Sequence, residues 1–190
     1  MPTLLILWVA GSRSLLQAQE LTHEPWTYKG EVFGSIVRGN FHLGNHPLGS
    51  GLSYTAGIGL RPFAGRLRGL GFEGEFNGLN FIREEGTDYE TRGSRQVVSG
   101  NVLYHLGSSC TQFFLLGGLG ILRAKYDSSI PDMTYHDEGT KMSLNLGLGL
   151  KIRLASRWAI RPELRIFDTT IGKGYNWNSV TFSCGVGYHW

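Results

Sequence analysis

The chain has 190 residues, of which 28 are glycine, 12% are aromatic and only 17% are charged, and its formal net charge is +3. Each glycine inside a helix costs about 1 kcal/mol, so this composition disfavours an all-helical fold, and the aromatic content excludes a disordered chain. The basic residues are dispersed and form no run or stripe, so nucleic acid is not an expected partner. A single all-β domain fits this composition best.

The first residues have the pattern of an export signal. A short apolar run at 3–10 is followed by a small residue, Ala18, at a position suited to cleavage. We expect residues 1–18 to form a signal peptide that is removed, and residues 19–190 to form one domain outside the cytoplasm. A buried N-terminal strand is the alternative for the same apolar run.

Five strands are predicted in the first two thirds of that domain. Apolar side chains alternate with polar residues or glycine in segments 52–60, 70–77 and 97–106. Successive side chains of a strand point to opposite faces, so each segment has one apolar face. Segments 29–38 and 112–125 are also predicted strands, but they are apolar on both sides, so their facing stays open.

The clearest alternation lies in the last third of the chain. Segment 140–154 is apolar at every even position from Met142 to Leu154, and polar, charged or glycine at the odd positions. The 3.6-residue period of a helix does not fit this pattern. Segments 158–168 and 180–190 show the same split. The total is eight strands of about 10 to 14 residues, which is long enough for tilted strands to cross a membrane.

The connections between the predicted strands alternate in length. Long, polar connections are expected at 39–50, 82–93, 126–139 and 169–178, and tight ones at 62–68, 107–111 and 155–157. Transmembrane barrels have short periplasmic turns and longer outer loops, and a membrane-spanning sheet must close to satisfy its backbone. The prediction is therefore a single eight-stranded antiparallel up-and-down transmembrane β-barrel, with both termini at the short-turn end.

Charged residues decide which face of these strands meets lipid, because a midplane Arg or Lys on the lipid side costs roughly 2 to 4 kcal/mol. We predict an interior charge network that consists of Glu73, Glu75, Lys151, Arg153, Arg161, Glu163 and Arg165. The lipid-facing row is predicted at Leu144, Leu146, Leu148, Leu150 and Ile152. Side chains just fill an eight-stranded interior, so we expect paired acids and bases and a plugged lumen.

This facing separates two neighbouring positions of segment 140–154. Leu148→Arg places a charge among acyl chains and is expected to block stable insertion. Gly149→Ser places a small hydroxyl on the inward face and is expected to be tolerated.

The end of the chain resembles the C-terminal assembly signature of bacterial outer-membrane barrels, with Ser183, Gly185, Tyr188 and Trp190 at its positions. Trp190 stands where phenylalanine is commoner. The whole domain resembles small eight-stranded outer-membrane barrels of the OmpA transmembrane-domain and OmpX type. This resemblance implies a monomer in the bacterial outer membrane that contacts membrane lipids and lipopolysaccharide and is inserted by the barrel assembly machinery.

The expected function is a structural or surface-interaction role, through adhesion or lipopolysaccharide contact, without enzyme activity, cofactor or metal. The acidic residues of segments 82–93 and 126–139 are interpreted as solvated loop residues, with divalent-cation binding as the alternative. Three other functions stay open: a small-solute porin, a soluble lipocalin-like ligand-binding barrel and an outer-membrane lipid-modifying enzyme. The enzyme is disfavoured because His105 and Ser108, three residues apart, come nearest to the deacylase pattern, which needs a spacing of two.

Overall fold

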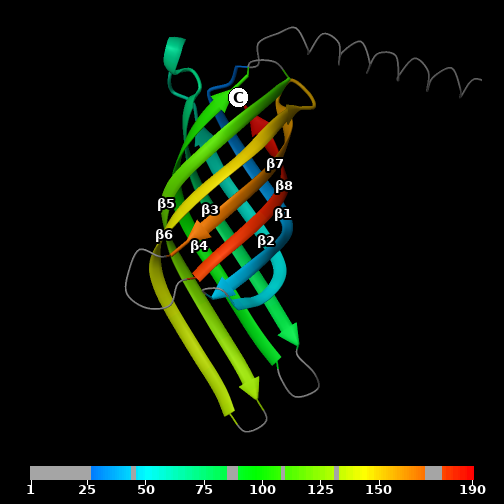
Figure 1. Cartoon of the computed structure of the whole chain (residues 1–190). Helices are drawn as coiled ribbons and strands as arrows, with labels where there is room; N and C mark the ends of the chain where they lie inside the picture. The colour runs from blue at the N-terminus through cyan, green and yellow to red at the C-terminus, as the bar shows by residue number, and fades with distance from the viewer. Residues whose placement is uncertain (1–26, 44–45, 85–89, 108–109, 131–132, 170–176) are drawn as a thin grey trace, which may run out of the picture.

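Eight antiparallel strands close into one barrel in the computed structural model, which describes residues 27–43, 46–84, 90–107, 110–130, 133–169 and 177–190 (Figure 1). Each strand pairs with its neighbours in sequence, and the last strand pairs with the first. The predicted fold class is confirmed. The expected signal peptide at 1–18 lies outside the described residues.

The strands are β1 (Gly30–Leu43), β2 (His46–Leu60), β3 (Leu70–Glu84), β4 (Glu90–Leu106), β5 (Thr111–Ile130), β6 (Met133–Arg153), β7 (Trp158–Asp168) and β8 (Trp177–His189). A short 3-10 helix, η1 (Gly65–Leu67), lies between β2 and β3. Within the described residues, no helix is long and apolar enough to cross a membrane.

Closure depends on the two ends of the barrel chain. Glu31 of β1 pairs with His189 of β8, and the backbone N–H of Trp190 donates to the carbonyl of Gly30 at 3.1 Å. The Trp190 ring lies against Gly30, where a Cβ atom would collide with it. A tryptophan can therefore cover the seam between β1 and β8 only because residue 30 has no side chain.

Three of the four connections expected to be long loops are mostly paired strand. The ladder of β5 and β6 continues to Ile130 and Met133, and that of β3 and β4 continues to Glu84 and Glu90. Segment 39–50 is likewise largely taken up by β1 and β2. The expected loop boundaries at 39–50, 82–93 and 126–139 are therefore wrong. A polar segment satisfies its backbone hydrogen bonds by pairing with a neighbouring strand, so polarity alone does not predict a loop. Most of segment 169–178 lies outside the described residues.

The extended strands make one side of the barrel taller than the other. In Figure 1, β5 and β6 and the ends of β3 and β4 run well past the rest of the barrel. The β6–β7 ladder begins only at Leu144 and Asp168, so β6 from Met133 to Ser143 continues beyond it. Val98, Ile121 and Met142 are register partners on β4, β5 and β6. We call the part of these three strands that lies farther from the short turns the projecting sheet: β4 before Val98, β5 after Ile121 and β6 before Met142.

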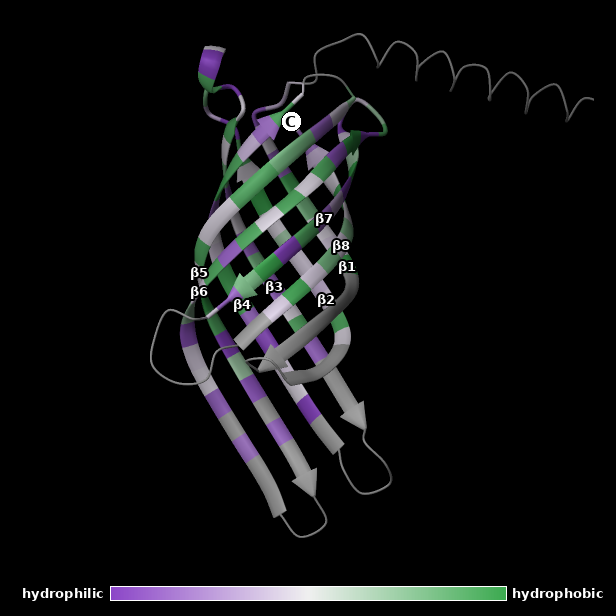
Figure 2. Cartoon of the chain, viewed as in Figure 1, coloured by the Kyte–Doolittle hydropathy of each residue, from purple (hydrophilic) through white to green (hydrophobic). Residues whose placement is uncertain are grey.

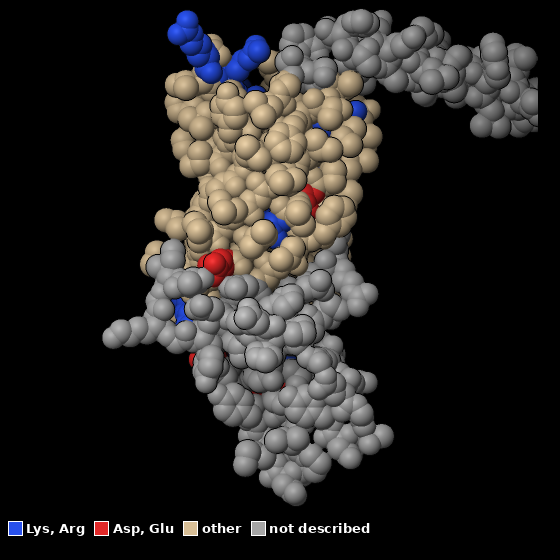
Figure 3. All heavy atoms as spheres, in the orientation of Figure 1, with Lys and Arg blue, Asp and Glu red and all other residues tan. Residues whose placement is uncertain are grey.

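The barrel wall is apolar on the outside. Figure 2 shows hydrophobic residues alternating along the strands, and Figure 3 shows few charged atoms on the visible face of the wall. The residues expected to face lipid, Leu144, Leu146, Leu148, Leu150 and Ile152, are all exposed on this wall. The two strands whose facing was open also present apolar residues outward, with Val32 and Ile36 on β1 and Leu115, Leu119 and Ile121 on β5.

Candidate functional site: the luminal charge cluster

Seven Glu, Lys and Arg side chains from four strands meet inside the barrel. They are Glu31 of β1, Glu73 and Glu75 of β3, Lys151 of β6, and Arg161, Glu163 and Arg165 of β7, and all are buried. We call this set the luminal cluster. Six of its members belong to the predicted interior network, and Glu31 is the addition.

Arg161 lies at the centre of the luminal cluster. Its Nη1 donates to Glu31 Oε1 at 3.2 Å, and its Nη2 lies 2.7 Å from Glu73 Oε2 and 3.0 Å from Glu163 Oε2. One guanidinium thereby joins a carboxylate of its own strand to carboxylates of β1 and β3, which are distant in sequence. Such charge-assisted bonds are the strongest class of protein hydrogen bond.

Arg165 and Lys151 extend the cluster on either side of Arg161. Arg165 Nη2 lies 2.5 Å from Glu163 Oε1 and 3.3 Å from Glu73 Oε1, and its Nη1 pairs with Glu75. Lys151 pairs with Glu31 and donates to the hydroxyl of Tyr28 at 2.8 Å. The cluster therefore crosses the lumen as one continuous set of ion pairs.

Glycines on the neighbouring strands make room for these long side chains. Six of the seven charged residues stand opposite a glycine in the strand registers: Glu31 and Glu73 opposite Gly59, Glu75 opposite Gly57, Arg161 opposite Gly185, Glu163 opposite Gly149, and Arg165 opposite Gly147. The inward faces thus alternate charge and space, which accounts for part of the high glycine content.

Gly149 has a second role that the sequence did not reveal. A Cβ atom there would lie 2.5 Å from the ring of Phe114 and 2.7 Å from the carbonyl oxygen of Pro162. Neither backbone nor a buried ring moves aside cheaply, so the expectation that Gly149→Ser is tolerated is wrong.

Aromatic rings line the central guanidinium. The Cζ of Arg161 lies 3.8 Å from the centroid of the Phe33 ring and 4.8 Å from that of Phe114. Phe114 packs with Leu103 and Leu116 in a small apolar core inside the barrel. The lumen is therefore not filled by charged and amide groups alone, and cation–π contact adds to the ion pairs around Arg161.

The buried charges balance. Among the described residues, four carboxylates (Glu31, Glu73, Glu75 and Glu163) and four cations (Lys151, Arg161, Arg165 and Arg95) are buried. Arg95 lies apart from the cluster, where it donates to Ser179 and Asn77 and lies 4.5 Å from the Phe167 ring. Among the described residues, these buried cations and carboxylates are interspersed and form no ring of one charge such as selectivity filters use.

Arg153 is not part of the luminal cluster. Its side chain is half-buried, its Nε has no hydrogen-bond partner, and within the described part of the chain no ion pair joins it to a carboxylate. Arg153 is the last residue of β6, and its backbone N–H donates to Cys110 in the short connection before β5. Arg153 lies at an odd, inward position of β6 as expected from the alternation. It is not in the cluster because it lies at the end of the strand.

Sequence reasoning missed Glu31 and Arg95. On β1, Glu31 and Phe33 face inward and Val32 faces outward. Because Phe33 is apolar, the inward face of β1 is not recognisable in the sequence as a polar face, and Glu31 was not assigned to the lumen. Arg95 lies between the expected end of a loop at 93 and the expected start of a strand at 97. Within the described residues, no group of His, Cys, Asp or Glu side chains is arranged to hold a metal ion.

The C-terminal signature residues have visible packing roles. A Cβ atom at Gly185 would collide with the backbone of Gly34, so the close approach of β1 and β8 requires a glycine there. The hydroxyl of Tyr188 accepts a hydrogen bond from Arg157 at 2.9 Å, and its ring packs 5.2 Å from that of Trp158. Ser183 is half-buried and Trp190 is exposed. The part these residues play in recognition during assembly stays a prediction.

A closed eight-stranded barrel with an apolar outer wall and paired charges inside defines the class of outer-membrane β-barrel proteins. Residues 10–189 match the family described as outer membrane protein beta-barrel domain, so the chain belongs to this family and is a protein of the bacterial outer membrane. Comparison with curated protein sequences gives no match.

Solved structures share this fold. Neisserial surface protein A has a TM-score of 0.68 at 15% identity, with 85% of this chain and 97% of that chain covered. Ail, the attachment invasion locus protein of Yersinia pestis, has a TM-score of 0.59 at 13% identity, with 86% and 99% covered. The N-terminal barrel of Pseudomonas aeruginosa OprF has a TM-score of 0.51 at 15% identity, with 86% and 98% covered. At these identities the likeness shows the fold.

Proposed function

We propose that this protein is a non-conducting outer-membrane barrel that acts at the cell surface by contacting lipopolysaccharide through the base of the projecting sheet. Supporting this proposal, outward-facing charged residues begin directly above the apolar wall. Gln96, Arg123 and Thr140 form one row across the projecting sheet, and Ser94, Lys125 and Glu138 form the next. The row beneath them consists of the exposed apolar residues Val98, Ile121 and Met142.

The position of Arg123 carries the proposal. It stands two residues beyond the exposed Ile121 on the same face of β5, which is about 7 Å along the strand. Lipopolysaccharide carries phosphates at the boundary between its acyl chains and its sugars, so a cation at this height lies at the level of those phosphates.

Glu138 holds the two cations in place. Arg123 Nε donates to Glu138 Oε1 at 2.7 Å, and Lys125 Nζ lies 3.2 Å from Glu138 Oε2. The hydrogen bond from Arg123 lowers the pKa of the Glu138 carboxyl, as does that from Lys125, so this carboxylate stays ionised at neutral pH. The trio has one excess positive charge, and both of its basic side chains are exposed.

One structural neighbour supports an anionic saccharide ligand. A structure of Ail from Yersinia pestis contains the heparin analogue sucrose octasulfate. That contact belongs to Ail, and it supports the proposal only by showing that a barrel of this fold holds a polyanion.

Charge reversal tests the surface role. We expect Arg123→Glu combined with Lys125→Glu to reduce the lipopolysaccharide that co-purifies with the detergent-extracted protein several-fold. Arg157→Glu makes the same kind of charge change at one position of the short-turn end and is the control. Equal co-purification with all three proteins would contradict the proposal.

Single-channel conductance distinguishes a barrel plugged by the luminal cluster from a small-solute porin. We expect no stable single-channel openings from the purified protein in planar bilayers, because paired side chains fill the lumen. Reproducible openings in the parent protein would favour the porin instead. Openings only in a variant that lacks Arg161 would support the plug.

A further inference from the structure

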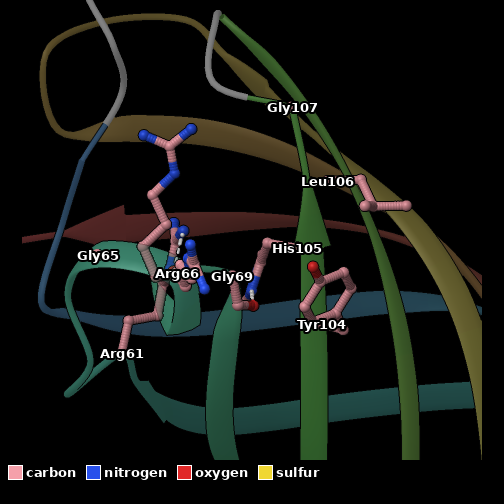
Figure 4. A pocket seen from close by; sticks show the side chains of 9 residues that line it. Arg61, Gly65, Arg66, Gly69, Tyr104, His105, Leu106 and Gly107 are labelled. Carbon is pink, nitrogen blue, oxygen red and sulfur yellow. Dashed lines mark hydrogen bonds between the residues drawn. The ribbon is translucent and has the colours of Figure 1, made fainter.

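A cationic pocket opens at the end of the barrel that carries the short turns. It has a volume of about 600 Å³, and its described lining includes Arg61, Arg66, Arg68, Tyr104, His105 and Leu106 (Figure 4). We call it the turn pocket. It lies between the β2–β3 connection, which includes η1, and the end of β4.

Arg61 is fixed within the turn pocket. Its Nη1 donates to Gln112 Oε1 at 3.2 Å, its Nη2 donates to the carbonyl of Arg68 at 2.8 Å, and its Cζ lies 4.6 Å from the centroid of the Tyr28 ring. All of these partners are neutral. The guanidinium is therefore held in position, and no described carboxylate forms an ion pair with it.

His105 forms the floor of the turn pocket. Its Nδ1 donates to the carbonyl of Gly69 at 3.1 Å, and its Nε2 faces the Tyr28 hydroxyl at 3.3 Å. The same hydroxyl accepts a hydrogen bond from Lys151, so the floor is connected to the luminal cluster. A Cβ atom at Gly69 would lie 2.7 Å from the His105 carbonyl oxygen, so glycine is needed for this close packing.

The described lining of the turn pocket carries positive charge only. Its nine described lining residues include three arginines and no carboxylate. Arg66 and Arg68 are exposed, and neither makes an ion pair with any described residue. Arginine presents planar donors that match phosphate oxygens, and neighbouring guanidiniums that repel one another are stabilised by a shared anion.

The outer side of the turn pocket is apolar. Tyr104 and Leu106 are exposed and belong to the outward face of β4, which continues the apolar wall through Val102. Leu67 and Phe63 are exposed in the connection beside them. A ligand that fits this site carries an anionic group for the arginines and hydrocarbon for the adjoining wall.

We propose that the turn pocket binds the phosphate group of a glycerophospholipid from the inner leaflet of the outer membrane. Short turns of outer-membrane barrels lie on the periplasmic side, so the pocket stands at the height of inner-leaflet headgroups. Arg66 and Arg68 contact the phosphate from the β2–β3 connection, Arg61 supplies the fixed charge beneath them, and the acyl chains run along Tyr104 and Leu106. The assignment concerns one defined lipid site, in addition to the general solvation of the wall.

Native mass spectrometry of the detergent-purified full chain tests this site. The probe is dioleoyl phosphatidylglycerol, titrated against the parent protein, the double variant Arg66→Ala with Arg68→Ala, and Arg157→Ala. Arg157 is an exposed arginine in another short turn and is the matched control. We expect the double variant to bind the lipid about five- to twentyfold more weakly, because it loses two charge-assisted contacts, and Arg157→Ala to bind like the parent.

Three outcomes would overturn the proposal. They are equal binding by the double variant and the parent, equal binding of dioleoylglycerol, which has no phosphate, and complete displacement of the lipid by millimolar inorganic phosphate, which would assign the site to the free ion. Folding is checked by heat-modifiable migration on gels. Should the double variant not fold, Arg66→Glu alone is expected to weaken binding to a similar extent.

Discussion

The luminal cluster and the projecting sheet contain the same chemistry in opposite surroundings. Inside the barrel, Arg161 and Glu73 pair at 2.7 Å with side chains that are 3% and 1% exposed. On the projecting sheet, Arg123 and Glu138 also pair, with side chains that are 55% and 32% exposed. The two arginine–glutamate pairs differ in access to water, and this difference decides what each contributes.

A buried pair and an exposed pair respond differently to the loss of one partner. Removing one member of a buried pair leaves a charge that neither water nor protein compensates, at a cost of about 3 to 5 kcal/mol. An exposed charge is hydrated as soon as its partner is gone, so exposed pairs contribute little. The luminal cluster is therefore expected to stabilise the barrel through mutual dependence of its members, whereas the projecting sheet is free to use its charges for binding.

The largest effect is expected from Arg161→Ala. This change leaves Glu31, Glu73 and Glu163 without their shared cation, and it removes the contact with the Phe33 ring. We expect the free energy of unfolding to fall by about 3 to 5 kcal/mol. Urea unfolding in phospholipid vesicles, followed by tryptophan fluorescence, measures it. A loss below about 1 kcal/mol, the scale of an exposed pair, would mean that burial does not distinguish the two regions.

Leu148→Arg tests how much an arginine on the lipid-facing side of the wall lowers the free energy of unfolding. Leu148 is exposed on β6, one residue away from the inward-facing Gly149, and an unpaired arginine there faces lipid. We expect a destabilisation of about 2 to 4 kcal/mol and reduced insertion, measured by heat-modifiable migration and vesicle refolding.

Gly59→Ser is the inward control for Leu148→Arg. A Cβ atom at Gly59 would have ordinary contacts, the nearest being 3.7 Å from the Phe72 carbonyl oxygen. We expect this variant to fold like the parent. Equal damage from Gly59→Ser and Leu148→Arg would mean that the inside and outside of the wall are not distinguished as described.

Arg123→Ala is expected to leave global stability unchanged. Arg123 and Glu138 are both solvated, and the Lys125 contact with Glu138 remains when Arg123 is lost. The urea midpoint in vesicles is expected to match that of the parent. A shift comparable with that of Arg161→Ala would show that the projecting sheet is a structural part of the barrel.

The smallest effect concerns pH. The Arg123 hydrogen bond lowers the folded-state pKa of Glu138, so the local stabilisation is present above the ordinary carboxyl pKa and is lost as pH falls through the lowered value. A carbon-detected NMR titration is expected to give a Glu138 midpoint below that of a free glutamate, and a higher one in Arg123→Ala. The same midpoint in both proteins would contradict the contact.

The faces of most strands were predictable because a barrel wall has one apolar and one filled side. Lys151 is an example: its neighbours Leu150 and Ile152 are apolar, so its inward position followed from parity alone. The same rule did not assign β1 or β5, because Phe33, Phe114 and Leu116 make the inward side apolar there. Aromatic and aliphatic residues inside a charged lumen conceal the alternation that reveals the charged ones.

The projecting sheet was not predictable for a different reason. In segment 126–139 both faces are polar, so a period of two distinguishes no inside from outside, and the residues were expected to form a loop. Whether a polar hairpin pairs depends on its partner strand, as with Lys125 opposite Glu138. The partners in each ion pair could not be predicted from the sequence either. The alternation assigns a charged residue to the lumen but does not give its position along the barrel axis.

The unequal heights of neighbouring strands leave a section of β6 beyond its ladder with β7, from Met133 to Ser143. Strand edges of this kind invite association with another sheet, and charged side chains are a common defence. The described residues of this section include the exposed His136, which pairs with Asp127, and Glu138. We expect such charges to oppose backbone pairing between the β6 edges of adjacent copies in a crowded membrane. The barrel would then stay separate from its neighbours although this section of β6 extends past its ladder with β7.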